Sequence, residues 1–287
     1  MDSLNWEGDV PQLRDPILVC SFRGWNDAAS AASSALTAVA DALDSEQIAH
    51  LDAEDYFDFQ ATRPTIVLSE GQARRIDWPH NNLIAARVPA ADRDLVLLDG
   101  TEPSLRWRTF SETIATAADA LGVEMVITLG SLIAEVSHTL PVPITGLASD
   151  EKLVEELDLQ RSSYEGPTGI VGVLHDCCRK EGMTSASLWA AVPHYVAAVP
   201  NPKAALALLR RLEGLTGVAV DAGDLEEEAT NFEEQIDRAI AANPEIEELV
   251  EKIEAEQSEQ LDSPEDLPSA DSIARDFQHF LRQQGSQ

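Results

Sequence analysis

The chain has 287 residues, with 51 Asp and Glu against 20 Lys and Arg and a formal net charge of −31 at pH 7. A surface this acidic repels phosphate groups, so nucleic acids and anionic membranes are excluded as partners. The length allows one large or two modest domains, and 44% hydrophobic with 25% charged residues is ordinary for a soluble globular protein.

The sequence shows no sign of a membrane or secreted protein. No stretch approaches the roughly 20 consecutive apolar residues that span a bilayer. The first residues, MDSLNWEGDVPQL, are acidic and lack the basic and apolar regions of a signal peptide. Three cysteines, of which Cys177 and Cys178 are adjacent, cannot form a disulfide framework. We therefore expect a cytoplasmic protein with reduced thiols.

The first 220 residues alternate between strand and helix patterns. Residues 16–22 form a continuous apolar run, which is typical of a strand buried on both faces. Gly24 and Asn26 then turn the chain into an Ala-rich helix at 28–43, with Asp27 as the expected N-cap. Further strands are expected at 65–69, 83–88, 94–99, 123–129, 144–148 and 185–192, and further helices at 106–121, 150–158, 169–181 and 202–215.

This alternation predicts a three-layer α/β/α sandwich around a largely parallel sheet. Residues 17–22 and 95–98 should be interior strands, because a continuous apolar run needs cover on both faces. We assign residues 1–223 to the α/β sandwich domain and 224–287 to an acidic helical C-terminal appendage.

The appendage carries 19 of the acidic residues and only four basic ones. Two helices that break near Pro244, a Pro/Ser/Asp-rich loop at 262–271 and a last amphipathic helix at 272–283 are expected. The acidic surface is either a solvated helical face, which we favour, or a docking surface for a basic partner. A thin apolar stripe runs along the first two helices: Phe232, Ile236, Ile240, Ile246, Leu249 and Ile253. It should bury against the α/β domain or another subunit, so we expect a homo-oligomer.

The turn RGWNDA at 23–28 follows the first apolar strand, where α/β sheets usually place ligands. Arg23 could hold an anion, aided by the dipole of the following helix. The single glycine, however, matches neither a dinucleotide fingerprint nor a phosphate loop. We favour a strand-to-helix turn capped by Asn26 or Asp27.

The segment DGTEPSLRWR at 99–108 follows another apolar strand and carries a charged cluster: Asp99, Glu102, Arg106 and Arg108. Carboxyl ends of parallel strands meet at one edge, so this loop and the 23–28 turn should lie on the same rim, with Arg23 or Asp27 near Glu102 or Arg106, and could face one pocket. Such clusters perform acid–base chemistry in enzymes. They also form ion-pair networks that fix loops, and without a nucleophile we favour the network slightly.

Two further segments carry candidate residues. GPTGIVG at 166–172 is interpreted as a turn into a helix on which His175 and Cys178 share a face. A Cys–His pair can act as nucleophile and base, but packing is the favoured interpretation. In the turn after the 185–192 strand, His194 and Tyr195 either bind a ligand or cap the sheet edge. The six histidines lack metal-site spacing, so we expect no metal and no cofactor.

Six segments occur in a characteristic order: GWNDA, EDYFDFQATRP, DLVLLDGTEPSLRW, SHTLPVPITG, YEGPTGIVGVL and SLWAAVPHYVAAVPNPKA. As a set they resemble the proteasome assembly chaperone 2 family in its actinobacterial-type form, over roughly residues 16–215. The resemblance implies a phosphorylase/hydrolase-type sandwich, related in shape to purine nucleoside phosphorylases. Eukaryotic members of that family assemble the proteasome α-ring as heterodimers, and archaeal relatives form homo-oligomers. Such chaperones often end in a hydrophobic–Tyr–any tail, which the final residues QQGSQ do not match.

Two functional hypotheses follow. The first is a non-enzymatic protein-assembly or scaffold factor on an enzyme-like fold, with a proteasome-related partner implied by the resemblance alone. The alternative is a small-molecule hydrolase or phosphorylase-like enzyme with a cleft lined by charged residues. No catalytic residue is assigned. The candidate cleft or ligand-binding residues are Arg23, Asp27, Asp99, Glu102, Arg106, Glu165 and His194.

Overall fold

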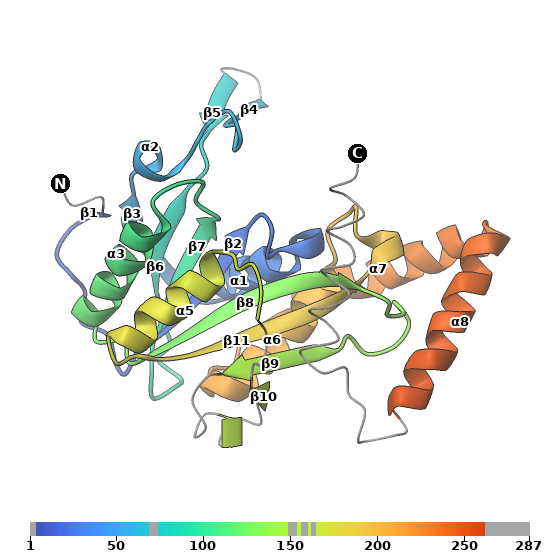
Figure 1. Ribbon diagram of the computed structural model, residues 1–287. Coiled ribbons are helices and arrows are strands. Elements are labelled where there is room, and N and C mark those ends of the chain that lie inside the picture. Colours follow the sequence, from blue (N-terminus) through green and yellow to red (C-terminus); the bar gives the residue numbers. More distant parts are fainter. Residues whose placement is uncertain (1–3, 69–73, 149–153, 156–159, 162–164, 262–287) are drawn as a thin grey trace.

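The structure is a computed structural model that describes residues 4–68, 74–148, 154–155, 160–161 and 165–261 (Figure 1). Within these ranges, nine strands form one mixed sheet. Their order across the sheet is β1 (Leu4–Trp6), β3 (Asp44–Leu51), β6 (Asn81–Arg87), β7 (Leu95–Thr101), β2 (Ile17–Arg23), β8 (Met125–Ala134), β11 (Thr184–Pro193), β9 (Ile144–Ala148) and β10 (Gln160–Arg161).

The centre of the sheet is parallel and its flanks contain antiparallel pairs. Strands β7, β2, β8 and β11 run in one direction, whereas β6 pairs antiparallel with β7, and β9 pairs antiparallel with β11. The prediction of a largely parallel sheet therefore holds only for the centre. The carboxyl ends of the four parallel strands meet at one edge, which we call the carboxyl rim.

The interior strands are as predicted, because β2 lies between β7 and β8, and β7 lies between β6 and β2. Every residue from Ile17 to Phe22 is buried. Strand β3 was not predicted, since its sequence DSEQIAHL begins with charged and polar residues and exposes most of its first half. Because the first half of β3 is polar, its sequence shows little of the apolar alternation that predicts a strand.

Helices cover both faces of the sheet, as the three-layer prediction requires (Figure 1). Helices α1 (Ala31–Ala42) and α6 (Pro202–Thr216) pack on one face. Helices α3 (Trp107–Ala120) and α5 (Ile170–Lys180) pack on the other. The core is thus divided by the sheet into two apolar clusters.

Helix α1 starts three residues later than the sequence predicted. A 3-10 turn, η1 (Ala28–Ser30), precedes it, and Ala29 and Ser30 have φ of 51° and 52°. Asp27 nevertheless caps the helix: its Oδ1 accepts hydrogen bonds from the N–H groups of Ala32 (2.9 Å) and Ser33 (3.2 Å). The predicted capping residue is therefore correct, although it acts across an intervening turn.

The predicted strand at 65–69 is a strand but not part of the main sheet. Strand β4 (Thr65–Leu68) pairs with β5 (Arg74–Asp77) in a separate two-stranded sheet. This hairpin follows the short helix α2 (Ala53–Tyr56) and projects from the body of the molecule (Figure 1). Every residue of both strands is exposed.

The appendage begins with two helices, α7 (Gly223–Ala241) and α8 (Pro244–Leu261), which break where predicted. Helix α7 packs on α6. The buried apolar residues here are Leu225, Ala229, Val250 and Ile253, while Phe232, Ile236, Ile240 and Ile246 are half-buried and Leu249 is 38% exposed. The predicted stripe is therefore covered only in part. The predicted 262–271 loop and 272–283 helix lie outside the described residues, as does the 150–158 helix except at 154–155.

Candidate functional site

An ion-pair network occupies the carboxyl rim at the ends of β2 and β7. Arg23 Nη1 lies 2.6 Å from Asp99 Oδ1, and His80 Nε2 lies 3.3 Å from Asp99 Oδ2. Arg23 pairs with Thr101 across the two strands, so the alternate residue Asp99 projects on the same face of the sheet. The network is half-buried, with 39% of the Arg23 side chain and 21% of the Asp99 side chain exposed.

The protonation states follow from these contacts. Burial acts to raise the pKa of Asp99, but hydrogen bonds from His80 and Arg23 outweigh it and hold the pKa below its ordinary value. The hydrogen bond to Asp99 raises the pKa of His80. Asp99 is thus an acceptor that both Arg23 and His80 already engage, which suits a network that fixes loops.

Glu102 joins three loops of the rim. Its backbone N–H donates to the carbonyl of Arg23 (2.9 Å). Its Oε1 accepts from the backbone N–H of Ile170 (2.9 Å) and from Asn26 Nδ2 (3.5 Å). Ile170 is the first residue of α5, whose N-cap residue Gly169 has no side chain to offer. Glu102 therefore caps a helix that lies 68 residues away in sequence.

Gly169 is required by this arrangement. A Cβ atom at Gly169 would lie 2.8 Å from Glu102 Oε1 and 3.0 Å from Asn26 Nδ2. The glycine-containing segment at 166–172 is thus a turn that lets the Glu102 carboxylate approach the helix, in agreement with the favoured interpretation of a turn.

Asp27 also stabilises a helix. Its Oδ2 accepts a hydrogen bond from Ser33 Oγ at 2.6 Å, in addition to the bonds that its Oδ1 accepts from the N–H groups of Ala32 and Ser33. Burial raises the pKa of Asp27, and hydrogen bonds from Ser33 and Ala32 oppose that rise. Protonation of the carboxyl would weaken three contacts at the start of α1. The geometry therefore assigns Asp27 to helix capping.

Arg106 and Glu165 stand apart from the Arg23 network. Arg106 Nη1 lies 2.6 Å from Asp55 Oδ1, and its guanidinium lies 5.8 Å from the ring centroid of Tyr56. Arg106 thus faces α2. Glu165 is exposed, and no contact within the described part of the chain joins it to the network. The prediction that the 23–28 turn and the loop after β7 share one rim, with Arg23 near Glu102, is confirmed by their backbone hydrogen bond, whereas Arg106 lies apart.

A second polar cluster, which we call the His138 cluster, lies where the loop after β8 meets η2 (His194–Val196) and α7. His138 is 4% exposed. Its Nδ1 lies 2.8 Å from the Tyr195 hydroxyl and its Nε2 lies 3.0 Å from Asp237 Oδ1. The Tyr195 hydroxyl also accepts from the His138 backbone N–H (2.9 Å). The predicted His194 is exposed beside this cluster.

The His138 cluster joins the loop after β8 to α7 and α8. The Lys203 ammonium donates to the His138 carbonyl and pairs with Glu233 of α7 at 3.1 Å. Ser137 Oγ and Thr139 Oγ1 lie 3.0 Å and 2.5 Å from Glu254 Oε1 of α8. Sequence reasoning missed His138 because one histidine in a Pro-rich loop carries no spacing signal. Only the tertiary contacts with α7 give it a role.

The His175 and Cys178 side chains are structural. His175 Nε2 lies 3.0 Å from Thr128 Oγ1, and burial lowers the His175 pKa to about 4. Burial raises the pKa of Cys178 to about 12 and also raises that of Cys20. A thiol with such a pKa is not a nucleophile at neutral pH, because thiolate is the reactive form. The packing interpretation is supported.

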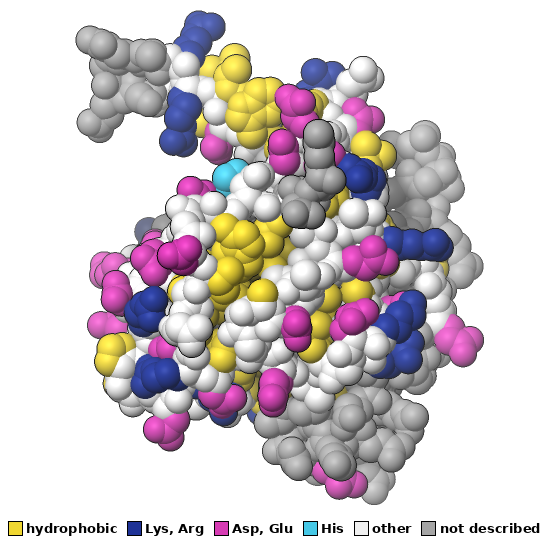
Figure 2. Space-filling model, turned by 90° about the vertical axis from the view of Figure 1, so that its left-hand side faces the viewer, with side chains coloured by type: hydrophobic (Ala, Val, Ile, Leu, Met, Phe, Trp, Pro, Cys, Tyr) yellow, Lys and Arg dark blue, Asp and Glu magenta, His cyan; other side chains and the backbone are white. Residues whose placement is uncertain are grey.

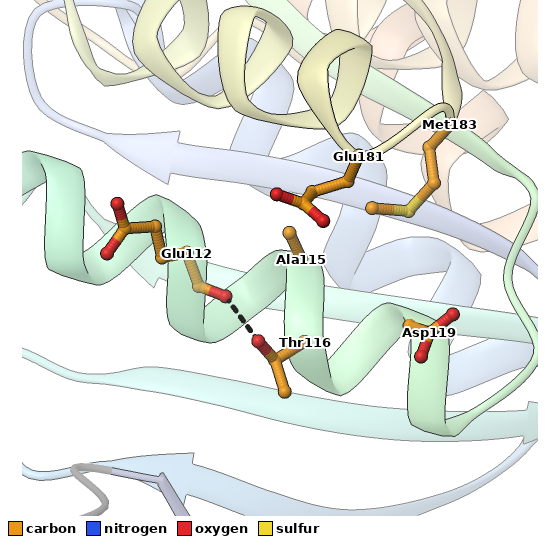
Figure 3. A pocket seen from close by; sticks show the side chains of 6 residues that line it. All are labelled: Glu112, Ala115, Thr116, Asp119, Glu181 and Met183. Carbon is orange, nitrogen blue, oxygen red and sulfur yellow. Dashed lines mark hydrogen bonds between the residues drawn. The ribbon is translucent and has the colours of Figure 1, made fainter.

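A pocket of about 250 Å³ lies between α3 and the residues that end α5 (Figure 3). Its lining consists of Glu112, Ala115, Thr116, Asp119, Glu181 and Met183. Thr116 and Asp119 lie in the last turns of α3, and Glu181 and Met183 connect α5 to the start of β11, so the pocket lies toward the amino edge of the sheet and away from the carboxyl rim. Within the described ranges there is no cluster of three or more potential metal ligands, and no helix there could span a bilayer.

Comparisons with known proteins define the class as an α/β sandwich of the PAC2 family. The PAC2 family model matches residues 21–240. A crystal structure of a PAC2 family protein from Streptomyces avermitilis is 48% identical, covering 82% of this chain and 100% of that chain, with a TM-score of 0.76. The chain therefore belongs to the PAC2 family.

Two further structures extend the comparison. The Mycobacterium tuberculosis proteasome-assembly chaperone homologue Rv2125 is 42% identical, covering 82% of this chain and 99% of that chain, with a TM-score of 0.74. The Pyrococcus furiosus archaeal proteasome activator PbaB is 18% identical, covering 83% and 99%, with a TM-score of 0.66, and shows the fold alone. No curated protein matches the chain.

Proposed function

We propose that this protein is a non-enzymatic assembly factor that binds proteasome subunits. The observation that carries the proposal is the 42% identity to a Mycobacterium tuberculosis protein described as a proteasome-assembly chaperone homologue, over 99% of that chain. Membership of the PAC2 family is consistent with it. The family resemblance of the six sequence segments further supports a sandwich of the phosphorylase/hydrolase type.

The chemistry of the carboxyl rim favours a binding surface over an active site. Asp27 and Glu102, two of the candidate cleft carboxylates, accept backbone N–H groups of α1 and α5. Asp99 is shared between Arg23 and His80. Groups committed in this way stabilise loops, and a catalytic role would require them to exchange partners. No observation favours the alternative of a hydrolase or phosphorylase-like enzyme.

Exposed apolar side chains beside these loops supply a contact for a protein client. Trp25 follows β2 and is 40% exposed, and Leu105 follows β7 and is 49% exposed. Aromatic and aliphatic side chains on a firmly held loop are typical of protein-binding surfaces. A cytoplasmic location and homo-oligomerisation, both expected from the sequence, remain part of the proposal.

The proposal is tested with the purified full chain and proteasome α- and β-subunits from the same organism. Native electrophoresis over time should show a complex with one subunit type and faster appearance of the assembled particle. Leu105→Arg should weaken the complex at least tenfold. Val10→Arg is the matched control, because Val10 is 40% exposed in the segment between β1 and β2 at the other edge of the sheet. If no complex forms at 50-fold excess of either subunit, the proposal is wrong.

A further inference from the structure

The β4–β5 hairpin has one apolar face. Side chains alternate between the faces of a strand, and Ile66 is paired with Ile76 and Leu68 with Arg74. One face therefore carries Ile66, Leu68 and Ile76. Trp78 continues the same alternation after β5, and we call β4, β5 and Trp78 the arm.

The opposite face of the arm is more polar. Thr65, Val67, Arg75 and Asp77 project there, and Arg75 Nη2 lies 3.8 Å from Asp77 Oδ1. The arm is thus an amphipathic two-stranded sheet, like a strand pair that rests on a core. In a folded protein the apolar face of such a sheet is normally covered by further strands or by a helix.

Among the residues that the structure describes, none covers the apolar face. Ile66 is 59% exposed, Leu68 is 75% exposed and Ile76 is 50% exposed. Trp78 is 46% exposed and meets Phe59 edge-on, with ring centroids 4.9 Å apart. That contact fixes the base of the arm only. Figure 2 shows hydrophobic side chains along the arm at the top of the view, flanked by basic ones.

The charge of the arm differs in sign from that of the whole chain. Residues 63–78 contain Arg63, Arg74 and Arg75 against Glu70 and Asp77, a net of +1, in a protein of net charge −31. Arg74 lies on the apolar face beside Leu68, its partner across the hairpin. A surface that fits this face is therefore apolar at its centre and acidic around it.

The strongly acidic remainder of the chain decides between classes of acidic partner. A nucleic acid or anionic membrane that approached the arm would be repelled by the rest of the molecule. A small acidic surface on a protein, by contrast, can contact the projecting arm without approaching the rest of the molecule. The chain itself has such a surface.

Helices α7 and α8 provide that surface. Their sequences contain fourteen Asp and Glu against Arg238 and Lys252. On α8, Leu249 is 38% exposed, and the neighbouring Glu248 and Glu251 are exposed. This apolar area surrounded by carboxylates is complementary to the apolar face and the arginine of the arm. In Figure 1 the arm and α8 lie at separate ends of the molecule, so the arm of one copy would meet α8 of another.

We propose that the β4–β5 arm docks on a second copy of this chain, with its apolar face on the acidic surface of α7 and α8. Burying Ile66, Leu68 and Ile76 supplies the apolar contact, and Arg74 meets the carboxylates. The inference rests on the homo-oligomerisation that is part of the proposed function and names its interface, whereas it does not require binding to proteasome subunits.

The first test measures the mass of the full chain by light scattering from 1 to 100 µM. The wild type should exceed the mass of one chain. The double variant Leu68→Ser/Ile76→Ser and the single variant Arg74→Glu should each raise the Kd of self-association at least tenfold. Val10→Ser and Arg179→Glu are controls outside the arm, the latter with a side chain 62% exposed, and should leave the Kd unchanged. Circular dichroism confirms that each variant is folded.

The second test identifies the docking surface by exchanging charges. The variant Glu248→Arg/Glu251→Arg should associate poorly with itself. Mixed with Arg74→Glu, it should form mixed oligomers, because in the mixture the arm of each variant meets an α8 of opposite charge on the other. A wild type that stays a single chain at 100 µM overturns the proposal, as do arm variants that keep the wild-type mass. A mixture that fails to associate rules out α7 and α8 as the docking surface. Loss of binding to another protein only, with self-association unchanged, also overturns it.

Discussion

The carboxyl rim and the β4–β5 arm are neighbours that are connected through His80. They differ in whether their side chains find partners within the same chain. On the rim, charged groups meet opposite charges or backbone N–H groups of the same chain, as Glu102 does at Ile170. On the arm, apolar groups such as Leu68 meet solvent. The difference indicates that the charged groups of the rim are satisfied by folding, whereas the apolar face of the arm requires a second molecule. Substitutions of the charged rim residues should therefore change stability, and those on the arm should change association.

The largest effect on stability is expected for Gly169→Ala. The new Cβ would lie 2.8 Å from Glu102 Oε1 and displace the carboxylate that caps α5. Overpacking of this kind costs about 1–3 kcal/mol, measurable by urea denaturation. Gly214→Ala is the control, because no neighbouring atom lies within 4 Å of its Cβ position in α6. It should be neutral or stabilising by up to about 1 kcal/mol. Equal effects of the two substitutions would show that the rim is not tightly held.

Removal of the cap itself should cost somewhat less. Glu102→Ala leaves the Ile170 N–H without its acceptor, and loss of a helix cap costs about 0.5–2 kcal/mol. Glu102→Gln retains a carbonyl oxygen and should recover most of that loss. The free energy of unfolding from urea denaturation checks both. If Glu102→Ala has no effect, the carboxylate does not stabilise α5, and a catalytic or ligand-binding role for Glu102 becomes the better explanation.

The Asp99–His80 pair should give a bell-shaped contribution to stability against pH. The Asp99 pKa is lowered from 3.8, so its contribution is present above that value and is lost as pH falls through the lower folded value. The His80 pKa is raised from 6.5, so its contribution is complete below pH 6.5 and is lost as pH rises through the higher folded value. The stability difference between wild type and Asp99→Asn should be greatest between pH 3.8 and 6.5.

The same pair can be followed by NMR titration of the His80 ring. The wild type should titrate above pH 6.5, and Asp99→Asn should move the His80 pKa downward, since the hydrogen bond to the carboxylate is the main cause of the rise. His50, which pairs with Glu7 elsewhere in the fold, provides an internal reference. An unchanged His80 titration in Asp99→Asn would show that the two groups are not coupled.

The smallest effect on stability is expected on the arm. Leu68→Ser replaces a side chain in a residue that is 75% exposed. Exposed substitutions usually change stability by less than about 0.5 kcal/mol. The measurement is made at low protein concentration, where self-association does not contribute. A loss above 2 kcal/mol under those conditions would mean that the arm is covered within a single chain, contrary to the comparison with the rim.

Much of the fold follows from apolar patterns. The continuous apolar run at 17–22 predicts an interior strand, and β2 is one. Asp27 was predicted as a cap from its position before an Ala-rich helix, and it accepts two N–H groups of that helix. Local patterns of this kind report backbone periodicity and helix ends, which depend on neighbouring residues only.

The candidate site could be predicted only in part. Arg23 and Asp99 were expected at one edge because both end parallel strands, and they form an ion pair. Arg106 was expected in the same group, but it turns toward Asp55. Its positive φ of 56° at the start of α3 accompanies that turn. Which partner a long side chain selects depends on loops that come from distant parts of the sequence.

The sequence by itself determined the α/β class, the interior strands, the break before Pro244 and the acidic character of the appendage, because composition and periodicity are properties of short segments. Only the tertiary structure decided that Glu102 caps α5, that His138 joins α7, and that the strand at Thr65–Leu68 leaves the main sheet. Each of these depends on contacts between residues far apart in the chain. A strand pattern records which side chains are apolar, but burial is decided by whether another element packs against them.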